Sequence, residues 1–533
     1  MKNASTSMYN AGWTTARPMQ RGNRLRKLHV INCALILSST GCIKVDTGHD
    51  FQEASRQAAQ RNGAEFAYDP ADEGLIQSRV RTLLEGGLTS DEAVCVALLN
   101  NPALQADFIA IGASRADVVQ SGLFTNPTLF FSVRFPEAGG RSNLGFSFAQ
   151  QLVDLWEIPV RKKVAEADLE RTVSTVLDRG VQLAADVRRQ CIQVLALKRA
   201  EQIAIENLDV TRQAQRLAQV RLDAGETDAI DVNLVSSHAF EVEQLLIGIR
   251  RDLAAAELDL SGTLGLVRWT DSWQLAGSLE KEAAPDGAID GLLQFASGER
   301  FDIRVVASQV ESAEAQLERE YLQIFPSVVL GLEVERKDRR ALPGRDILGD
   351  TARASIAAGA PTAPTIQSRA QRDLIRRQIV DSLIGPSVQL TLPLWDQNQA
   401  QIEKTRFAVI QLRKQYQSVL DRAAREVRQA RVKATAAHEL VVLLESKSLP
   451  RARQNVDIIR RQYENGDQSI LFLLESQEFL LHQGRAYVDA LRDSALANAE
   501  LTRALGGRRP GLTTSQPMPT LSSTTEGVTD ASN

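Results

Sequence analysis

Long stretches of the chain carry apolar or small residues at steps of three and four positions. Between Arg161 and Leu222 there is no proline and only one glycine, Gly180. The stepping positions are Leu169, Val173, Val176, Gly180, Leu183, Val187, Cys191 and Val194. This spacing predicts a single helix on the order of 90 Å long with a coiled-coil seam. The pattern breaks at Gly225, and a second helix is expected to run back to about Gly265.

Two shorter segments alternate between apolar and polar residues, which predicts β-strands. In residues 128–135 and 143–149 the apolar positions are Leu129, Phe131, Val133, Phe135, Leu144, Phe146 and Phe148. The residues between them, 137–141, contain Gly139 and Gly140. Such a segment suits the turn of a hairpin.

The same order of elements recurs in the second half of the chain. A predicted helix over 300–321 leads into alternating strands with Val328, Leu330, Leu332, Val334, Val388, Leu390 and Leu392 on one side. From Asn398 to Leu449 there is neither glycine nor proline. The apolar positions of this segment step by about 3.5 residues, which is the period of a left-handed coiled coil. Gly466 occupies the position in the second half that Gly225 occupies in the first, which indicates an internal duplication.

Two segments depart from this order. The second hairpin carries an insert at about 340–382 that is rich in Ala, Gly, Pro and Arg, and we expect it to form a long loop. Residues 267–297 contain Pro285 and several glycines. They are expected to be irregular.

The N-terminus carries a targeting signal. Basic residues precede an apolar stretch from Leu28 to Leu37, and small residues follow up to Cys42. This predicts a secretory signal peptide over 1–41, too short to span a bilayer. The small residues before Cys42 resemble a bacterial lipobox, which implies a lipidated Cys42. Ser39 stands where leucine is usual, so an ordinary signal peptide with a chance cysteine is the alternative.

The two ends of the mature chain are polar. Residues 42–87 indicate a lipid-anchored tether with a helix around 75–84. Residues 508–533 are rich in Ser, Thr and Pro. This composition indicates a disordered tail.

Composition excludes several classes of protein. Lys and Arg number 62 against 66 Asp and Glu. The basic face that a nucleic-acid partner requires is therefore not expected. The four cysteines form no C-x-x-C pair, which argues against a disulfide framework or a zinc site. The scattered His238, His438 and His482 predict no metal site. Without a nucleophile and base set, a phosphate loop or a supported carboxylate pair, we expect no catalysis and no cofactor.

The strands are the expected route across a membrane. After the signal, no apolar run approaches the ~20 residues of a membrane helix. Four strands of about 8 residues are close to the ~9–11 that cross a bilayer, although a small soluble sandwich would alternate in the same way. The secretory signal favours membrane-crossing strands over a soluble sandwich. Four strands cannot close a water-filled barrel, but three chains supply twelve and leave no free edge.

The predicted fold is mainly α with a small β part. It is a duplicated long-helix coiled-coil barrel with four transmembrane strands per chain, which close a twelve-stranded barrel in a trimer.

Several motifs resemble one known family. The sequences LTSDEA at 88–93, NNPAL at 100–104 and QSGLFTNP at 120–127 resemble the opening of TolC-like outer membrane efflux proteins. LPLWDQNQ at 392–399 resembles their strand-to-helix junction, most closely in members paired with heavy-metal exporters. The likeness covers about 88–507 as two repeats, 88–298 and 299–507.

The resemblance implies a homotrimeric channel subunit in the outer membrane of a Gram-negative-type bacterium, anchored by lipid and extending into the periplasm. It also implies a periplasmic adaptor (membrane fusion protein) and an inner-membrane pump, usually proton-driven, as partners. The implied activity is passive export of small solutes such as drugs or metal ions.

The resemblance also places the two helical turns at a closed periplasmic tip. The candidate tip or gate residues are Gly225, Asp228, Asp231, Tyr463, Gly466, Phe472 and Glu475. Phe472 stands where the family often has an aspartate and Gln468 where it has an arginine, so an apolar constriction is an alternative to a charged ring. The glycines also suit helix C-caps, and the acids suit helix N-termini. Trp156 and Trp395, at strand ends, suit either a membrane-interface girdle or a core.

Two other functions compete with the channel. A periplasmic adaptor or coiled-coil assembly protein of an export system would share the signal, anchor and coiled coil. Adaptors have one central hairpin flanked by β domains, whereas this chain has duplicated helices and few strands. A secreted enzyme would need the catalytic residues that the sequence lacks.

Overall fold

The computed structural model describes residues 44–135, 142–269, 273–284, 288–338, 356–359 and 380–508. From Thr47 onward the chain forms one compact unit. The predicted signal peptide, Cys42, the turn at 137–141, most of the insert at 340–382 and the tail beyond Arg508 lie outside the described residues.

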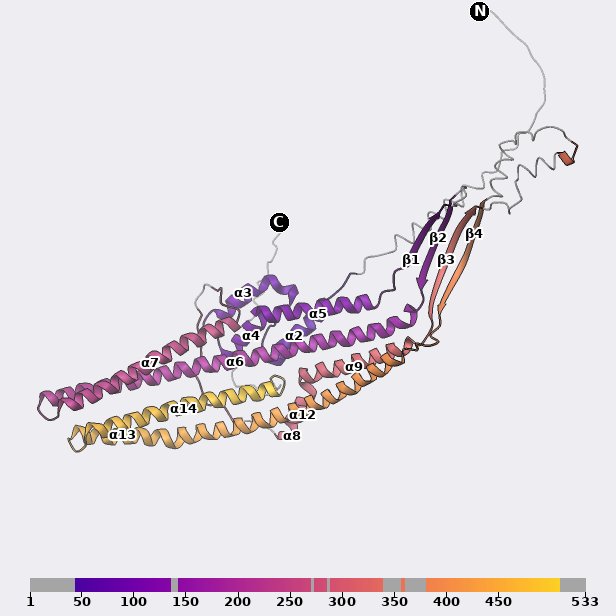
Figure 1. Ribbon diagram of the computed structural model, residues 1–533. Coiled ribbons are helices and arrows are strands. Elements are labelled where there is room, and N and C mark those ends of the chain that lie inside the picture. The colour runs from indigo at the N-terminus through magenta and orange to yellow at the C-terminus, as the bar shows by residue number, and fades with distance from the viewer. Residues whose placement is uncertain are drawn as a thin grey trace, which may run out of the picture. The chain divides into compact units, whose positions relative to one another are not determined.

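The first half of the chain follows the predicted order. Helices α4 (Ser90–Asn100) and α5 (Pro102–Ser121) lead into β1 (Thr128–Arg134) and β2 (Asn143–Gln151). Helix α6 (Asp154–Asp223) follows and turns back as α7 (Ala229–Thr263) (Figure 1). Helix α6 has 70 residues. At 1.5 Å per residue it extends on the order of 100 Å, so the predicted long helix is confirmed.

Local capping explains where these helices begin. The Thr89 hydroxyl accepts a hydrogen bond from the Glu92 amide, and the Glu92 carboxylate accepts one from the Thr89 amide at 2.8 Å. This capping box starts α4 at Ser90. Helix α6 begins at Asp154, before the predicted Arg161. The buried Asp154 carboxylate accepts from the Thr125 amide at 2.7 Å and pairs with Arg161 at 3.2 Å, which ties the helix start to the chain entering β1.

The second half repeats this order. Helix α9 (Phe301–Leu322) leads into β3 (Ser327–Asp338) and β4 (Val380–Thr391). Helix α12 (Gln399–Leu443), the π-helical segment η2 (Leu444–Ser448) and α13 (Leu449–Glu464) run consecutively, and α14 (Ile470–Ala504) turns back. The sequence predicted an uninterrupted α-helix up to Leu449. Pro450 lies in the first turn of α13. It cannot donate a backbone hydrogen bond, and the preceding turn widens to a π-helix.

The four strands form one antiparallel sheet in the order β1-β2-β3-β4 (Figure 1). Strand β4 begins well before Val388, the first of its predicted apolar positions, and continues through Pro386. Within the described chain β4 is at the edge of the sheet. Proline is tolerated in such a position.

The polar tether expected at 42–87 is in large part folded. Helix α2 (Gly48–Asn62), the 3-10 turn η1 (Pro70–Asp72) and α3 (Glu73–Leu84) occupy it. Ala54, Ala58 and Val80 are almost completely buried in a core that also contains residues of α4, α5 and α6. The helix predicted around 75–84 is confirmed. The rest was missed because the buried face of α2 is mostly alanine, which gives a weak hydrophobic signal.

The stretch 267–297 is also not wholly irregular. Helix α8 (Ile289–Glu299) occupies its end, and Leu292 and Ala296 pack against Val427 of α12 and Leu501 of α14. Because α8 contains glycines, the spacing of its apolar residues did not predict a helix.

Among the described residues, no single helix has the length and apolar composition needed to span a membrane. In the described part of the chain, one pair of helices, α4 and α5, meets those criteria together with a bend of 50°, and α4 is buried from Ala93 to Leu99.

Candidate membrane surface and channel gate

One face of the sheet is apolar across all four strands. Directly paired residues point to the same side of a sheet. The register aligns Phe131, Phe146, Val334 and Ile384 in one row, and Leu129, Phe148, Leu332 and Pro386 in the next. The predicted grouping of apolar strand residues is confirmed.

This apolar face is open in the single chain. Phe131 is 66% exposed, Ile384 71% and Val388 62%. Large apolar patches of this kind mark interaction or membrane surfaces. The opposite face is mostly small or polar, with Ser147 paired to Glu333 and Gly331 to Ser387, although Phe130 and Leu383 also lie on it.

The two predicted tryptophans differ in their surroundings. Trp395 follows β4 and is 89% exposed, beside the exposed Leu392 and Leu394. Trp156 lies in the first turn of α6, is half-buried, and its indole N–H has no hydrogen-bond partner among the described residues.

The two helical turns lie together at the far end of the hairpins. Gly225 follows α6 with a φ of 77°, and Gly466 follows α13 with a φ of 83°. Both adopt the left-handed conformation that glycine favours. Arg221 of the first turn donates to the Tyr463 carbonyl oxygen at 2.7 Å. Its guanidinium carbon lies 4.8 Å from the centre of the Tyr463 ring, a cation–π contact. The turns of the two repeats are therefore directly bonded to each other.

Tyr463 is the buried centre of this tip. Its side chain packs with Ala218, Val235, Ile470 and Leu473 from the two hairpins. Burial, and to a lesser degree the nearby Asp231, raise the pKa of the Tyr463 phenol against the opposing charge of Arg221.

The other predicted tip residues are more open. Asp228 is the N-cap residue of α7, but its side chain makes no capping hydrogen bond. The Asp231 carboxylate accepts from the Thr227 hydroxyl. On α14, Phe472 is 51% exposed. Glu475 is also exposed, and its spacing of three residues places it on the same side of the helix as Phe472.

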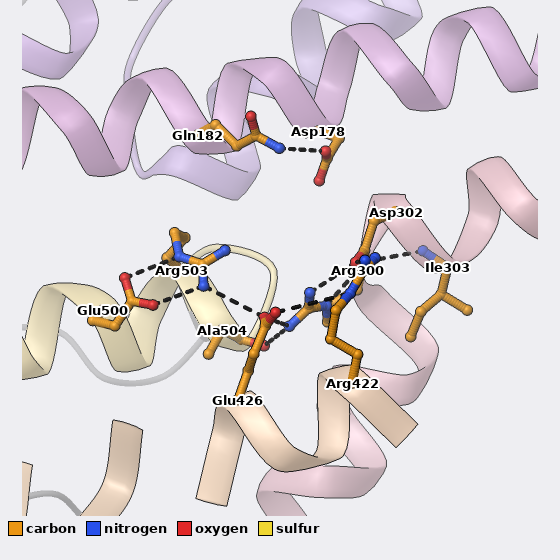
Figure 2. Close-up of polar contacts among 10 residues, drawn as sticks. All are labelled: Asp178, Gln182, Arg300, Asp302, Ile303, Arg422, Glu426, Glu500, Arg503 and Ala504. Atoms are coloured by element: carbon orange, nitrogen blue, oxygen red, sulfur yellow. Dashed lines mark hydrogen bonds and ion pairs between the residues drawn. The ribbon is translucent and has the colours of Figure 1, made fainter. Parts of the chain in front are cut away.

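A cluster of charges around the buried Arg300, defined here as the Arg300 cluster and shown in Figure 2, was not predicted from the sequence. Its members are Arg300, Asp302, Arg422, Glu426, Glu500 and Arg503. Arg300 is 5% exposed, donates to Asp302 at 2.7 and 2.9 Å, and donates to Glu426 and the Ala504 carbonyl at 2.9 Å each. The sequence signal for this cluster was limited to an arginine just before a predicted helix, in Gly-Glu-Arg-Phe-Asp.

The charges of this cluster hold each other ionised. Burial opposes ionisation of Asp302, but the hydrogen bonds and charge of Arg300 outweigh it, and the pKa of Asp302 is below its ordinary value. Arg503 donates to both Glu500 oxygens and lies 3.4 Å from Glu426. The cluster therefore joins the start of α9, the middle of α12 and the end of α14.

The described residues offer little reactive chemistry. They contain no group of three His, Cys, Asp or Glu side chains that could hold a metal ion. Burial raises the pKa of the Cys95 thiol, and raises the pKa of Cys191 to about 12. Both thiols therefore stay protonated near neutral pH, and a protonated thiol is a poor nucleophile.

The chain matches the model of one protein family. The model described as Outer membrane efflux protein matches residues 94–266 and 292–507, more than half of the chain. Among curated proteins, none matches the chain in sequence.

Solved structures share the fold at low identity. CusC aligns with a TM-score of 0.61 at 16% identity, over 81% of this chain and 92% of that chain. VceC from Vibrio cholerae aligns at 0.58 and 16% identity, over 81% and 96%. The open state of MtrE from Neisseria gonorrhoeae aligns at 0.55 and 17% identity, over 78% and 88%.

The long helical hairpins, the small antiparallel sheet and the family match define the class of protein. The chain belongs to the outer membrane efflux protein family. It is an outer membrane channel subunit of a tripartite efflux system, and the predicted fold class of long helices with a small sheet is confirmed. Its family is one of export ducts, not of enzymes.

Proposed function

We propose that three copies of the chain close a twelve-stranded barrel in the outer membrane, continued by a tunnel of long helices. The observation that carries this proposal is the sheet, whose strands β1 and β4 each have one partner within the described chain. An unpaired edge beside an open apolar face is stable only when another strand and lipid cover both. Joining β1 of one copy to β4 of the next removes every edge.

The dimensions support a membrane crossing by the sheet. Strands β1 and β2 have 7 and 9 residues, and strands β3 and β4 have 12 residues each. About 9–11 residues are needed to cross a bilayer. The exposed Trp395 suits the interface between lipid and water, and Trp156, at the corresponding place in the first repeat, would serve the same girdle. The insert at 340–382 would then lie outside the cell, because it connects β3 to β4 at the end of the sheet opposite the long helices.

The remaining features would place the duct in an export system. A lipidated Cys42 would anchor the N-terminus, and residues 42–87 would connect that anchor to the first repeat, 88–298. The tip around Gly225 and Gly466 would meet a periplasmic adaptor and, through it, a proton-driven inner-membrane pump. The duct itself would pass small solutes, drugs or metal ions, from the periplasm to the exterior without converting them.

Loss of the chain is expected to sensitise its host to at least one class of exported compound. A strain that lacks the gene would be compared with the parent across metals, dyes and antibiotics, by the concentration that inhibits growth. A copy of the gene on a plasmid should restore the parent's resistance. Unchanged inhibition across all three classes would contradict the export role.

The gate is proposed to be an apolar constriction in which three copies of Phe472 meet. An apolar ring excludes water from a narrow pore, and Asp228, Asp231 and Glu475 would give its surroundings a negative charge. Phe472→Ser is expected to raise the ion conductance of the closed channel several-fold in planar bilayers. Phe479→Ser, two turns along α14 and similarly exposed, is the matched control and should leave conductance unchanged. Equal effects of both variants would place the constriction elsewhere.

A further inference from the structure

We propose that Asp178 and the Arg300 cluster form a proton-binding lock between the two repeats of the chain, in which Asp178 takes up the proton. Asp178 belongs to α6 of the first repeat, whereas the members of the Arg300 cluster all belong to the second. Figure 2 shows Asp178 and Gln182 on α6 facing Arg300, Asp302 and Arg503.

The lock encloses very little space. Asp178, Gln182, Arg300, Asp302 and Arg503 line a cavity of about 10 Å³ together with Val181, Phe301 and Gly506. Such a volume holds at most one water molecule. A hydrated metal ion does not fit, whereas protonation of a carboxylate requires no additional space.

Asp178 is the surplus carboxylate of the site. Arg300 is bonded to Asp302 and Glu426, and Arg503 to Glu500, with Glu426 near it. Asp178 itself accepts one hydrogen bond, from the Gln182 amide at 2.7 Å. Within the described part of the chain it has no ion pair, because the guanidinium groups that face it are already paired.

Charges on every neighbouring element bear on this carboxylate. From α9 and its N-cap it faces Asp302 and Arg300, and from α14 it faces Arg503, with Glu500 behind. From α12, Glu426 and Arg422 complete the cluster. On the side of α5, the adjacent Arg179 is paired with Asp107.

These neighbours favour the protonated form. Burial first, and then the negative charge of Asp302, raise the pKa of Asp178 to about 6, although Arg300 and Arg503 oppose the rise. The ordinary value for aspartate is 3.8. The folded chain therefore binds the proton more tightly than the unfolded chain does.

The sign of the pH effect follows from this difference. A pKa that is raised in the folded state gives stability that is fully present below the ordinary value and is lost as the pH rises through the folded value. For Asp178 that folded value is about 6. Above that pH, Asp178 places a second negative charge beside Asp302 and loosens the contact between α6 and the second repeat. Mildly acid medium thus tightens the joint between the repeats.

The test compares Asp178→Asn with the wild type in the full-length, detergent-solubilised protein. The thermal unfolding midpoint would be measured from pH 3 to 8. At pH 7.5 the variant is expected to unfold a few degrees higher, since the amide carries no charge. The difference should shrink as the pH falls below about 6 and vanish only below the ordinary value of 3.8. Asp186→Asn changes a half-exposed aspartate of α6 that is paired with Arg189. It is the control and should show no inflection near pH 6.

A second measurement does not depend on the stability of the variant. In difference infrared spectra between pH 7.5 and 5, the wild type should show the carbonyl stretch of one more protonated carboxylic acid per chain than Asp178→Asn does, with a midpoint near pH 6 for this additional band. That band should be absent from Asp178→Asn and present in Asp186→Asn. A wild-type spectrum without the band, or midpoints of Asp178→Asn that follow the wild type at every pH, would overturn the proposal.

Discussion

Phe146→Arg is expected to prevent stable insertion of the channel in the outer membrane. Phe146 lies between Phe131 and Val334 in the central row of the apolar sheet face and is 43% exposed in the single chain. Arginine on the lipid face near the bilayer midplane costs about 2–4 kcal/mol for each copy. A closed trimer carries three copies, so the combined cost approaches the whole stability of a typical protein. The measurement is the fraction of chain recovered in outer-membrane preparations.

The neighbouring residue provides the control, because successive side chains of a strand point to opposite faces. Ser147→Arg places the same charge on the polar face, directly opposite Glu333. An opposite-charge pair across two strands is mildly stabilising. Ser147→Arg should therefore insert as the wild type does and keep its heat-stable oligomer. If both variants are lost from the membrane, or neither is, the apolar face is not the lipid surface.

The sequence predicted the elements whose hydrophobic pattern is long and regular. The seam of α6 and the alternating residues of β1 to β4 repeat often enough to identify the element without knowledge of its neighbours. The face on which each strand residue lies could also be anticipated, because a shift by one residue would move Ser147 to the apolar face and Phe146 to the polar face. The boundaries were less accurate, as Asp154 and Pro386 show, since buried ion pairs and an edge position override local signals.

Elements that owe their stability to packing could not be predicted in the same way. Helix α2 buries alanines such as Ala54 and Ala58, which have little hydrophobic signal of their own. Helix α8 contains two internal glycines and is held by contacts with α12 and α14, which are distant in sequence. Both helices depend on surfaces that only the folded chain creates.

The residues of the candidate site could likewise be predicted only where a local conformation determines them. Gly225 and Gly466 could be placed in tight turns because their conformation is a local requirement. The bond from Arg221 to the Tyr463 carbonyl joins residues of different repeats, and a single sequence does not specify it. The Arg300 cluster draws on three helices, so the sequence showed its charges but not the contacts among them.

Arg300→Ala is expected to destabilise the helical part of the protein by about 3 kcal/mol, which is typical for the removal of one partner from a buried ion pair. The loss leaves the partly buried carboxylate of Asp302 with Arg422, at 3.6 Å, as its remaining cationic neighbour among the described residues. Glu426 still has Arg503 at 3.4 Å as a partner, which reduces the loss of stability. The thermal unfolding midpoint at pH 7 measures the effect. Arg406→Ala, which removes an exposed pair with Glu403, should change the stability by less than about 1 kcal/mol.

The pH dependence identifies the cause of this loss. Arg300 keeps the pKa of Asp302 below its ordinary value. The pair therefore contributes stability that is present above about pH 4 and is lost as the pH falls further. The difference between wild type and Arg300→Ala should shrink in acid, opposite to the direction expected at Asp178. Arg300→Met combined with Asp302→Leu removes both charges and should recover part of the stability, because an apolar pair needs no compensation. A double variant less stable than Arg300→Ala would show that the ion pair itself, and not the stranded carboxylate, stabilises the start of α9.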